Sequence, residues 1–93
     1  MIKMVFGINE DKVNDADMAT DIVRNYLQKQ SGDLGLIMFR VEKVKPNAQE
    51  GKWYVTCSLF TNLGAIKRVY YHIKVNTKTG KIEEVNKADK PSE

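Results

Sequence analysis

Apolar and polar residues alternate along residues 52–76, and this period of two predicts a long β-hairpin. One face of the first arm carries Trp53, Val55, Cys57 and Leu59, and the second arm repeats the pattern with Val69, Tyr71, Ile73 and Val75. Residues 62–64, Asn-Leu-Gly, have the form of a three-residue hairpin loop, with Gly64 suited to a positive φ. This loop places Cys57 opposite Val69, and that register brings both apolar sets to one side of the sheet.

A second pattern, with apolar residues three and four apart, predicts an amphipathic helix that ends near Gly32. Asn14 is the expected N-cap, and Val13 and Met18 have the spacing of a hydrophobic staple. The apolar stripe consists of Met18, Ala19, Ile22, Val23, Tyr26 and Leu27. Because one face of the helix is apolar, we expect it to pack on the apolar side of the sheet.

Two segments on either side of the helix are expected to extend the sheet. Residues 2–6 are apolar enough for a short edge strand. Residues 34–45 form a longer strand that Pro46 ends. In this strand Val44 is out of phase with the preceding apolar residues, which indicates a β-bulge.

The fold class that these elements predict is α+β. After the hairpin, residues 77–80 form a turn that pairs Val75 with Ile82 in a last strand at residues 81–85. Residues 1–86 would then form a single domain and residues 87–93 a polar C-terminal tail. The order is β-α-β-β-β-β, with one helix packed on a four- to five-stranded antiparallel meander sheet.

The composition is that of one globular domain, with 93 residues of which 42% are hydrophobic and 29% charged. Cys57 is the single cysteine, which excludes an intramolecular disulfide and a multi-cysteine zinc site, and its place on the apolar face indicates burial. No segment is apolar over the length that a signal peptide or a bilayer span requires. We therefore expect a cytoplasmic protein that does not associate with membranes.

The order of a strand, a helix and four antiparallel strands resembles the cystatin fold, in which a sheet wraps around one long helix. Residues 70–85 also resemble the closing strands of PepSY-type domains, where an alternating strand runs through a Thr-x-Thr-Gly-Lys-like turn into a short strand. Cystatins inhibit cysteine proteases with a glycine-bearing N-terminus, a Gln-x-Val-x-Gly hairpin and a Pro-Trp hairpin. The resemblance therefore implies a possible inhibitor function.

The residues at the matching places depart from the inhibitor motifs. Gly7 corresponds to the N-terminal glycine, and residues 47–51 correspond to the first hairpin. Gly51 is present, but Asn47 replaces the glutamine and Gln49 replaces the valine, and residues 77–80 contain no Pro-Trp pair. The alternative to an inhibitor loop is an ordinary exposed hairpin loop.

The chain offers few groups for catalysis, with one histidine, His72, and one cysteine, Cys57. In the predicted register they lie on opposite sides of the sheet, which excludes a Cys-His nucleophilic pair. Asp17 and Asp21 are one helical turn apart, but acidic residues early in a helix are explained by the helix dipole. We expect a protein that is not an enzyme and that has no catalytic residues, metal site or cofactor.

The sheet face opposite the helix is the candidate binding surface, because a single helix leaves this face open. It combines aromatic and cationic side chains at alternating positions of the strands. Its members are Arg40, Tyr54, Thr56, Phe60, Arg68, Tyr70, His72 and Lys74.

Three interpretations of this surface stay open. Its side chains can be ordinary cross-strand pairs that stabilise the sheet, or they can anchor a protein partner or a second copy in a homodimer. They can also bind single-stranded nucleic acid, with aromatic rings stacked on bases and cations on phosphates. Residues 34–93 hold 11 basic and six acidic side chains, which favours an anionic partner on the sheet side.

Overall fold

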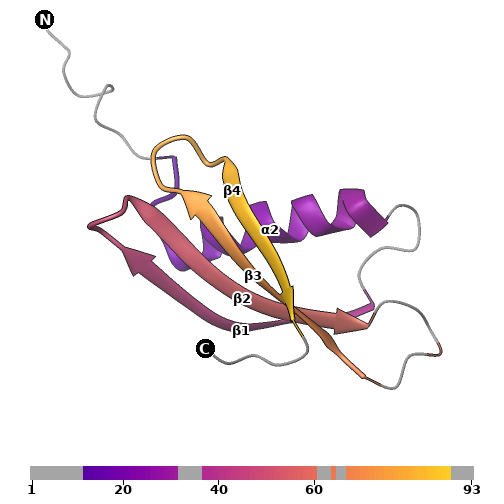
Figure 1. The fold of residues 1–93 in the computed structure, drawn as a ribbon. Helices are drawn as coiled ribbons and strands as arrows, with labels where there is room; N and C mark the ends of the chain where they lie inside the picture. The colour runs from indigo at the N-terminus through magenta and orange to yellow at the C-terminus, as the bar shows by residue number, and fades with distance from the viewer. Residues whose placement is uncertain (1–11, 32–36, 61–63, 65–66, 89–93) are drawn as a thin grey trace, which may run out of the picture.

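The computed structural model describes residues 12–31, 37–60, 64 and 67–88 (Figure 1). Its elements are, in chain order, α2 (Ala16–Ser31), β1 (Ile37–Asn47), β2 (Lys52–Phe60), β3 (Val69–Asn76) and β4 (Ile82–Ala88). Neighbouring strands are antiparallel, and the sheet order is β1-β2-β3-β4. The predicted α+β class, with a helix on an antiparallel meander, is confirmed. The strand predicted at residues 2–6 lies outside the described residues.

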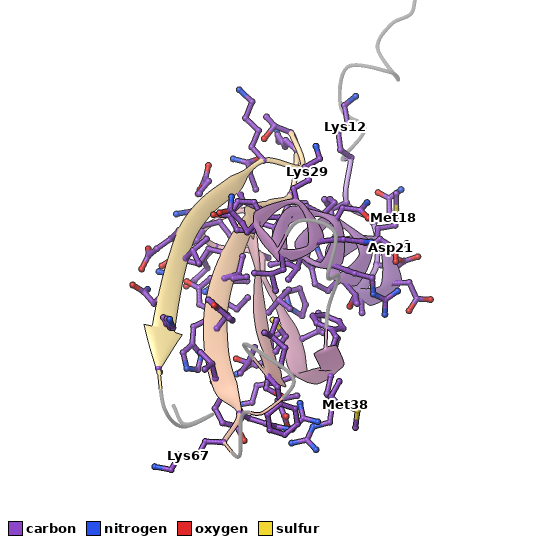
Figure 2. The ribbon with its side chains drawn as sticks, turned by 90° about the vertical axis from the view of Figure 1, so that its right-hand side faces the viewer. Lys12, Met18, Asp21, Lys29, Met38 and Lys67 are labelled. Atoms are coloured by element: carbon purple, nitrogen blue, oxygen red, sulfur yellow. The ribbon has the colours of Figure 1, made fainter. Side chains whose placement is uncertain are left out.

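The core lies between α2 and one face of the sheet (Figures 1 and 2). The buried apolar side chains are Val13, Ala19, Val23, Leu27, Val55, Cys57, Leu59, Ile73 and Val75. In β2 and β3 these are the positions that the period of two assigned to the core face. Trp53 packs at the margin of this core, and its indole Nε1 donates a hydrogen bond to the carbonyl of Val13 at 3.3 Å.

The helix begins one residue later than predicted. Asp15, not Asn14, is the N-cap, because the Asp15 Oδ1 atom accepts a hydrogen bond from the backbone N–H of Met18 at 2.9 Å. The predicted staple does not form: Val13 is 1% exposed, whereas Met18 is 39% exposed and points away from the sheet (Figure 2). A backbone hydrogen bond from Val13 to Thr77 draws this side chain into the core instead. Among the described residues, no helix is long and apolar enough to cross a membrane.

The register of β2 and β3 differs from the prediction by two residues. Leu59, not Cys57, lies opposite Val69, and Cys57 lies opposite Tyr71. The prediction of a three-residue loop was wrong, because β2 ends at Phe60 and the next strand begins only at Val69. Residues 62 and 63 lie outside the described part of the chain. A shift of two residues leaves every side chain on its predicted face, so the core assignment is unaffected.

The predicted bulge in β1 is present. The pairing of β1 with β2 shifts between Val41 and Lys43, after which Val44 lies opposite Val55 and packs on the core. The prediction that Pro46 ends this strand is wrong, since β1 continues to Asn47. Proline is tolerated there because β1 is at the edge of the described sheet, where a missing N–H removes no ladder bond.

The turn between β3 and β4 lies where the sequence placed it. Asn76 Oδ1 accepts hydrogen bonds from the backbone N–H groups of Lys78 and Thr79, each at 2.9 Å, and Gly80 has a φ of +76°. The predicted pairing of Val75 with Ile82 is confirmed. β4 continues to Ala88, beyond the strand end predicted at residue 85. The longer strand extends the sheet face opposite α2.

Replacing Ile73 with alanine should lower the free energy of unfolding by about 2 to 5 kcal/mol, because the removed atoms leave a cavity under α2. Lys74→Ala, the next residue on the opposite face, is the control and should cost much less, because the ion pair of Lys74 is at the surface. Urea denaturation followed by circular dichroism measures both values. Equal losses would contradict one-sided burial of the sheet.

The Cys57 thiol should resist alkylation in the native protein and react rapidly in denaturant. The residue is fully buried, and this burial, with a smaller contribution from Glu42, raises the pKa of the thiol to about 12. Because the thiolate is the reactive form, both access and ionisation oppose the reaction. The rate of labelling by iodoacetamide with and without urea measures the difference, and rapid labelling of folded protein would disprove the burial.

Candidate functional site

The face of the sheet turned away from α2, the open face, is covered by no described helix or strand (Figure 2). The strand registers and hydrogen bonds place all eight predicted surface residues on it: Arg40, Tyr54, Thr56, Phe60, Arg68, Tyr70, His72 and Lys74. Arg68 precedes β3 and reaches this face through a hydrogen bond from its Nη1 to Ser58 Oγ at 3.0 Å. The structure therefore brings the predicted residues together on one surface.

A row of four polar side chains, the middle row, crosses the open face from strand to strand. Thr56 on β2 lies opposite Lys43 on β1 and His72 on β3. His72 in turn lies opposite Asn86 on β4. Thr56 Oγ1 and His72 Nδ1 are 3.2 Å apart and share a hydrogen bond. The middle row contains no carboxylate.

The neighbouring row consists of Lys45 on β1, Tyr54 on β2 and Lys74 on β3, and we call it the aromatic row after Tyr54 at its centre. The Lys74 ammonium is 5.1 Å from the centroid of the Tyr54 ring and forms an ion pair with Glu84 at 3.3 Å. The Tyr54 hydroxyl donates a hydrogen bond to the Glu50 carboxylate. This bond is the main cause of the raised pKa of Tyr54. The ring is thus held at its face by Lys74 and at its hydroxyl by Glu50.

A hollow of about 260 Å³ opens between the middle and aromatic rows. It is lined by Lys43, Lys45, Tyr54, Val55, Thr56, His72, Ile73, Lys74 and Asn86. Lys43 and Lys45 form no ion pair with any residue in the described segments, whereas Lys74 is paired with Glu84. The hollow therefore has two ammonium groups whose charge no described carboxylate neutralises.

On the other side of the middle row, Arg40, Glu42, Ser58 and Arg68 form a polar cluster. Glu42 Oε2 accepts hydrogen bonds from Arg40 Nε at 2.6 Å and from Ser58 Oγ at 2.9 Å. Arg68 Nη1 bonds to Ser58 and also to the carbonyl of Met38 at 2.7 Å. The bond from Arg40, and next the bond from Ser58, lower the pKa of Glu42. Ser58 is fully buried under these side chains although it belongs to the open face.

The one histidine and the one cysteine lie on opposite faces of the sheet. Cys57 is in the core under α2, and His72 is half-buried on the open face. The predicted separation of the two groups is confirmed, and it leaves Cys57 without an imidazole that could act as its base. Within the described part of the chain, no group of three metal-ligating side chains is placed to hold an ion.

Of the inhibitor-like residues, Asn47 ends β1, and Gln49 and Gly51 lie in the turn between β1 and β2. Asn47 Oδ1 accepts the backbone N–H of Glu50 at 3.1 Å, Gly51 has a φ of +68°, and Gln49 is exposed. A hollow of about 350 Å³ lies beside the turn. It is lined by Val13, Asn14, Pro46, Asn47, Ala48, Gly51, Lys52, Trp53, Thr77 and Lys78. The turn is compact and presents no large apolar side chain.

Sequence reasoning missed other residues of the open face, including Glu42, Lys43, Lys45, Ser58, Glu84 and Asn86. Lys43 and Lys45 were missed because the bulge changes which residues of β1 face the core, whereas Glu42 shares the face of Arg40 by simple alternation. The out-of-phase Val44 was the available signal. Since Val44 faces the core, its neighbours on both sides belong to the open face.

No protein-family model matches the chain, and neither a curated protein nor a solved structure matches it. The resemblances to cystatins and to PepSY-type domains therefore stay predictions. Function is inferred from the open face and the hollow on it.

The polar cluster should make stability depend on pH through Glu42. The pKa of Glu42 is lower in the folded chain than its ordinary value, so its ionised form stabilises the fold above that ordinary value. This contribution is lost as the pH falls through the depressed folded pKa. Glu42→Gln should therefore show a smaller loss of stability than the parent protein between about pH 7 and pH 3.

The measurement is urea denaturation at a series of pH values. Arg40→Gln supplies the matched background, because it removes the main cause of the lowered pKa of Glu42. In that background Glu42→Gln should change the pH dependence less. An unchanged pH profile for Glu42→Gln in the parent protein would contradict the role of this carboxylate.

Proposed function

We propose that the protein is a small non-catalytic binding module whose open face binds an anionic partner. The observation that carries the proposal is an excess of positive charge on a sheet face that no described element covers. The cations are Arg40, Lys43, Lys45, Lys52, Arg68 and Lys74, and the carboxylates are Glu42, Glu83 and Glu84 on the strands and Glu50 in the turn beside Tyr54. Such an excess raises the local concentration of an anionic partner and speeds its association.

Several side chains of the open face are held in place before a partner arrives. Arg68 is fixed by hydrogen bonds to Ser58 and Met38, and its guanidinium lies 4.9 Å from the centroid of the Phe60 ring. Tyr54 is fixed by Lys74 and by the Glu50 carboxylate. Fixed side chains lose less conformational entropy on binding, which supports a recognition surface over a merely solvated one.

Among anionic partners, single-stranded nucleic acid fits the placement of Tyr70. On the β2 side its side chain hydrogen-bonds with Arg40 above the buried Ser58, and its neighbour on β4 is the small residue Ala88. Tyr70 is half-buried, so a part of it is available for stacking on a base. The cations on β1 lie to one side, where a backbone could follow them.

A homodimer through the open face is the second candidate, and the same half-exposed Tyr70 favours it as an apolar anchor. A symmetric dimer puts one patch against its own copy. Lys43 and Lys45 would then approach a surface that also has excess positive charge, which is unfavourable. Charge therefore favours a different, anionic partner.

The protease-inhibitor function that the cystatin resemblance implies has less support. An inhibitor of that kind needs an apolar wedge, and the exposed tip of the β1–β2 turn consists of Ala48, Gln49 and Glu50. These side chains are small, polar or charged.

The test compares Tyr70→Ser with the parent protein on two labelled probes: an oligothymidylate of about 15 nucleotides and a poly-glutamate of similar length. Tyr70→Ser should weaken binding of the oligothymidylate about tenfold or more, the loss expected for one stacked base. Met18→Ser is the matched control, since it truncates an exposed apolar side chain on α2 and should leave binding unchanged. Fluorescence anisotropy at about 50 and 200 mM salt measures both.

Sedimentation equilibrium at two protein concentrations completes the test. A monomer that binds either anionic probe through Tyr70 supports the proposal. A mass that doubles with concentration, together with no binding of either probe, would replace it with the homodimer. A monomer that binds neither probe at low salt would overturn the proposed use of the open face.

A further inference from the structure

The geometry points to a phosphate-binding site in the hollow between the middle and aromatic rows. This inference rests on the proposed function of the open face and names the chemical group that the face binds. The hollow has a volume of about 260 Å³, below the roughly 300 to 1,000 Å³ typical of pockets for drug-sized ligands. Its size suits one small group of a larger ligand, with the remainder lying across the face.

The middle row supplies hydrogen-bond donors and itself contains no carboxylate, although Glu84 on β4 accepts one of them. Lys43 is a donor through its ammonium group, and Asn86 has two amide N–H groups, of which one bonds to Glu84 at 2.6 Å. Thr56 and His72 share one hydrogen bond. If the Thr56 hydroxyl donates in it, the Nε2–H of the neutral His72 ring is free, and if His72 Nδ1 donates, the hydroxyl is free. Either arrangement leaves a donor for a ligand oxygen.

The charge of the hollow matches a phosphate group. Lys43 and Lys45 lie two residues apart on β1, about 7 Å along the strand, and neither has an ion-pair partner within the described ranges. A phosphate monoester carries a charge of about −1.5 to −2 at neutral pH. Two unneutralised ammonium groups therefore balance one phosphate monoester, or two neighbouring phosphodiesters of a strand with one negative charge each.

Lys74, the third lysine of the hollow, has a structural role. Lys74 forms an ion pair with Glu84 and lies over the Tyr54 ring, so its positive charge is largely neutralised within the protein. It forms one wall of the hollow and fixes Tyr54 beside it. A phosphate held by Lys43 and Lys45 would thus lie close to an aromatic ring, the pairing of groups that a nucleotide presents.

Titration of the ¹⁵N-labelled protein with inorganic phosphate tests this site. At constant ionic strength, set with sodium chloride, phosphate should cause saturable shifts of the backbone amides of Thr56, His72 and Asn86. In the double variant Lys43→Gln and Lys45→Gln the apparent dissociation constant should rise at least tenfold. Lys12→Gln with Lys29→Gln is the matched control: it removes the same charge from exposed lysines outside the hollow and should bind as the parent does (Figure 2).

Two further ligands distinguish the source of the phosphate. An oligothymidylate that binds much more tightly than thymidine monophosphate, with both affinities lowered by the Lys43 and Lys45 variant, identifies a nucleic-acid strand. Equal affinities for the two ligands identify a small phosphorylated molecule. Both results support the phosphate site.

Three outcomes would overturn the inference: shifts that do not saturate, shifts that chloride reproduces, or equal phosphate affinity in the Lys43 and Lys45 variant. Binding of poly-glutamate that depends on Tyr70, without any effect of phosphate on the hollow, would leave the proposed function standing and remove the phosphate site alone. The two proposals therefore fail on different measurements.

Discussion

Burial of the sheet on one side only is the constraint on which the rest of the structure depends. α2 presents a narrow stripe centred on Ala19, Val23 and Leu27, and this stripe covers the core face of β1, β2 and β3. Nothing described covers the other face, so each strand must keep one face apolar and the other compatible with water. Val55 and Ile73 therefore alternate with residues that are free to serve recognition, and the open face follows from the way the core is built.

The bulge in β1 determines which cations reach the open face. Without the shift between Val41 and Lys43, the period of two would turn Val44 out of the core and its lysine neighbours into it. With the shift, Val41 and Val44 lie opposite the buried residues Cys57 and Val55, and Lys43 and Lys45 stand beside Thr56 and Tyr54. A local irregularity that satisfies packing thus also creates the cationic side of the hollow.

Sequence reasoning recovered the faces of the strands far better than their register. Face assignment needs only the period of two, which is strong in β2 and β3, and a register error of two residues preserves it. Register depends on the connection, and the Asn-Leu-Gly motif at residues 62–64 suggested a shorter loop than the one between Phe60 and Val69. The eight predicted surface residues were found by alternation. Lys43 and Lys45 could be found only by reversing the alternation along β1 after the bulge.

Stability and binding draw on different cations of the open face. The carboxylates of Glu42 on β1 and Glu84 on β4 both have lowered pKa values, the first chiefly because of Arg40 and the second because of Asn86 and then Lys74. These acids therefore stay ionised at neutral pH and keep their own cations occupied. Neither carboxylate forms an ion pair with Lys43 or Lys45, which follow Glu42 along β1. The ion pairs of Glu42 and Glu84 thereby leave Lys43 and Lys45 with the charge that a phosphate would neutralise.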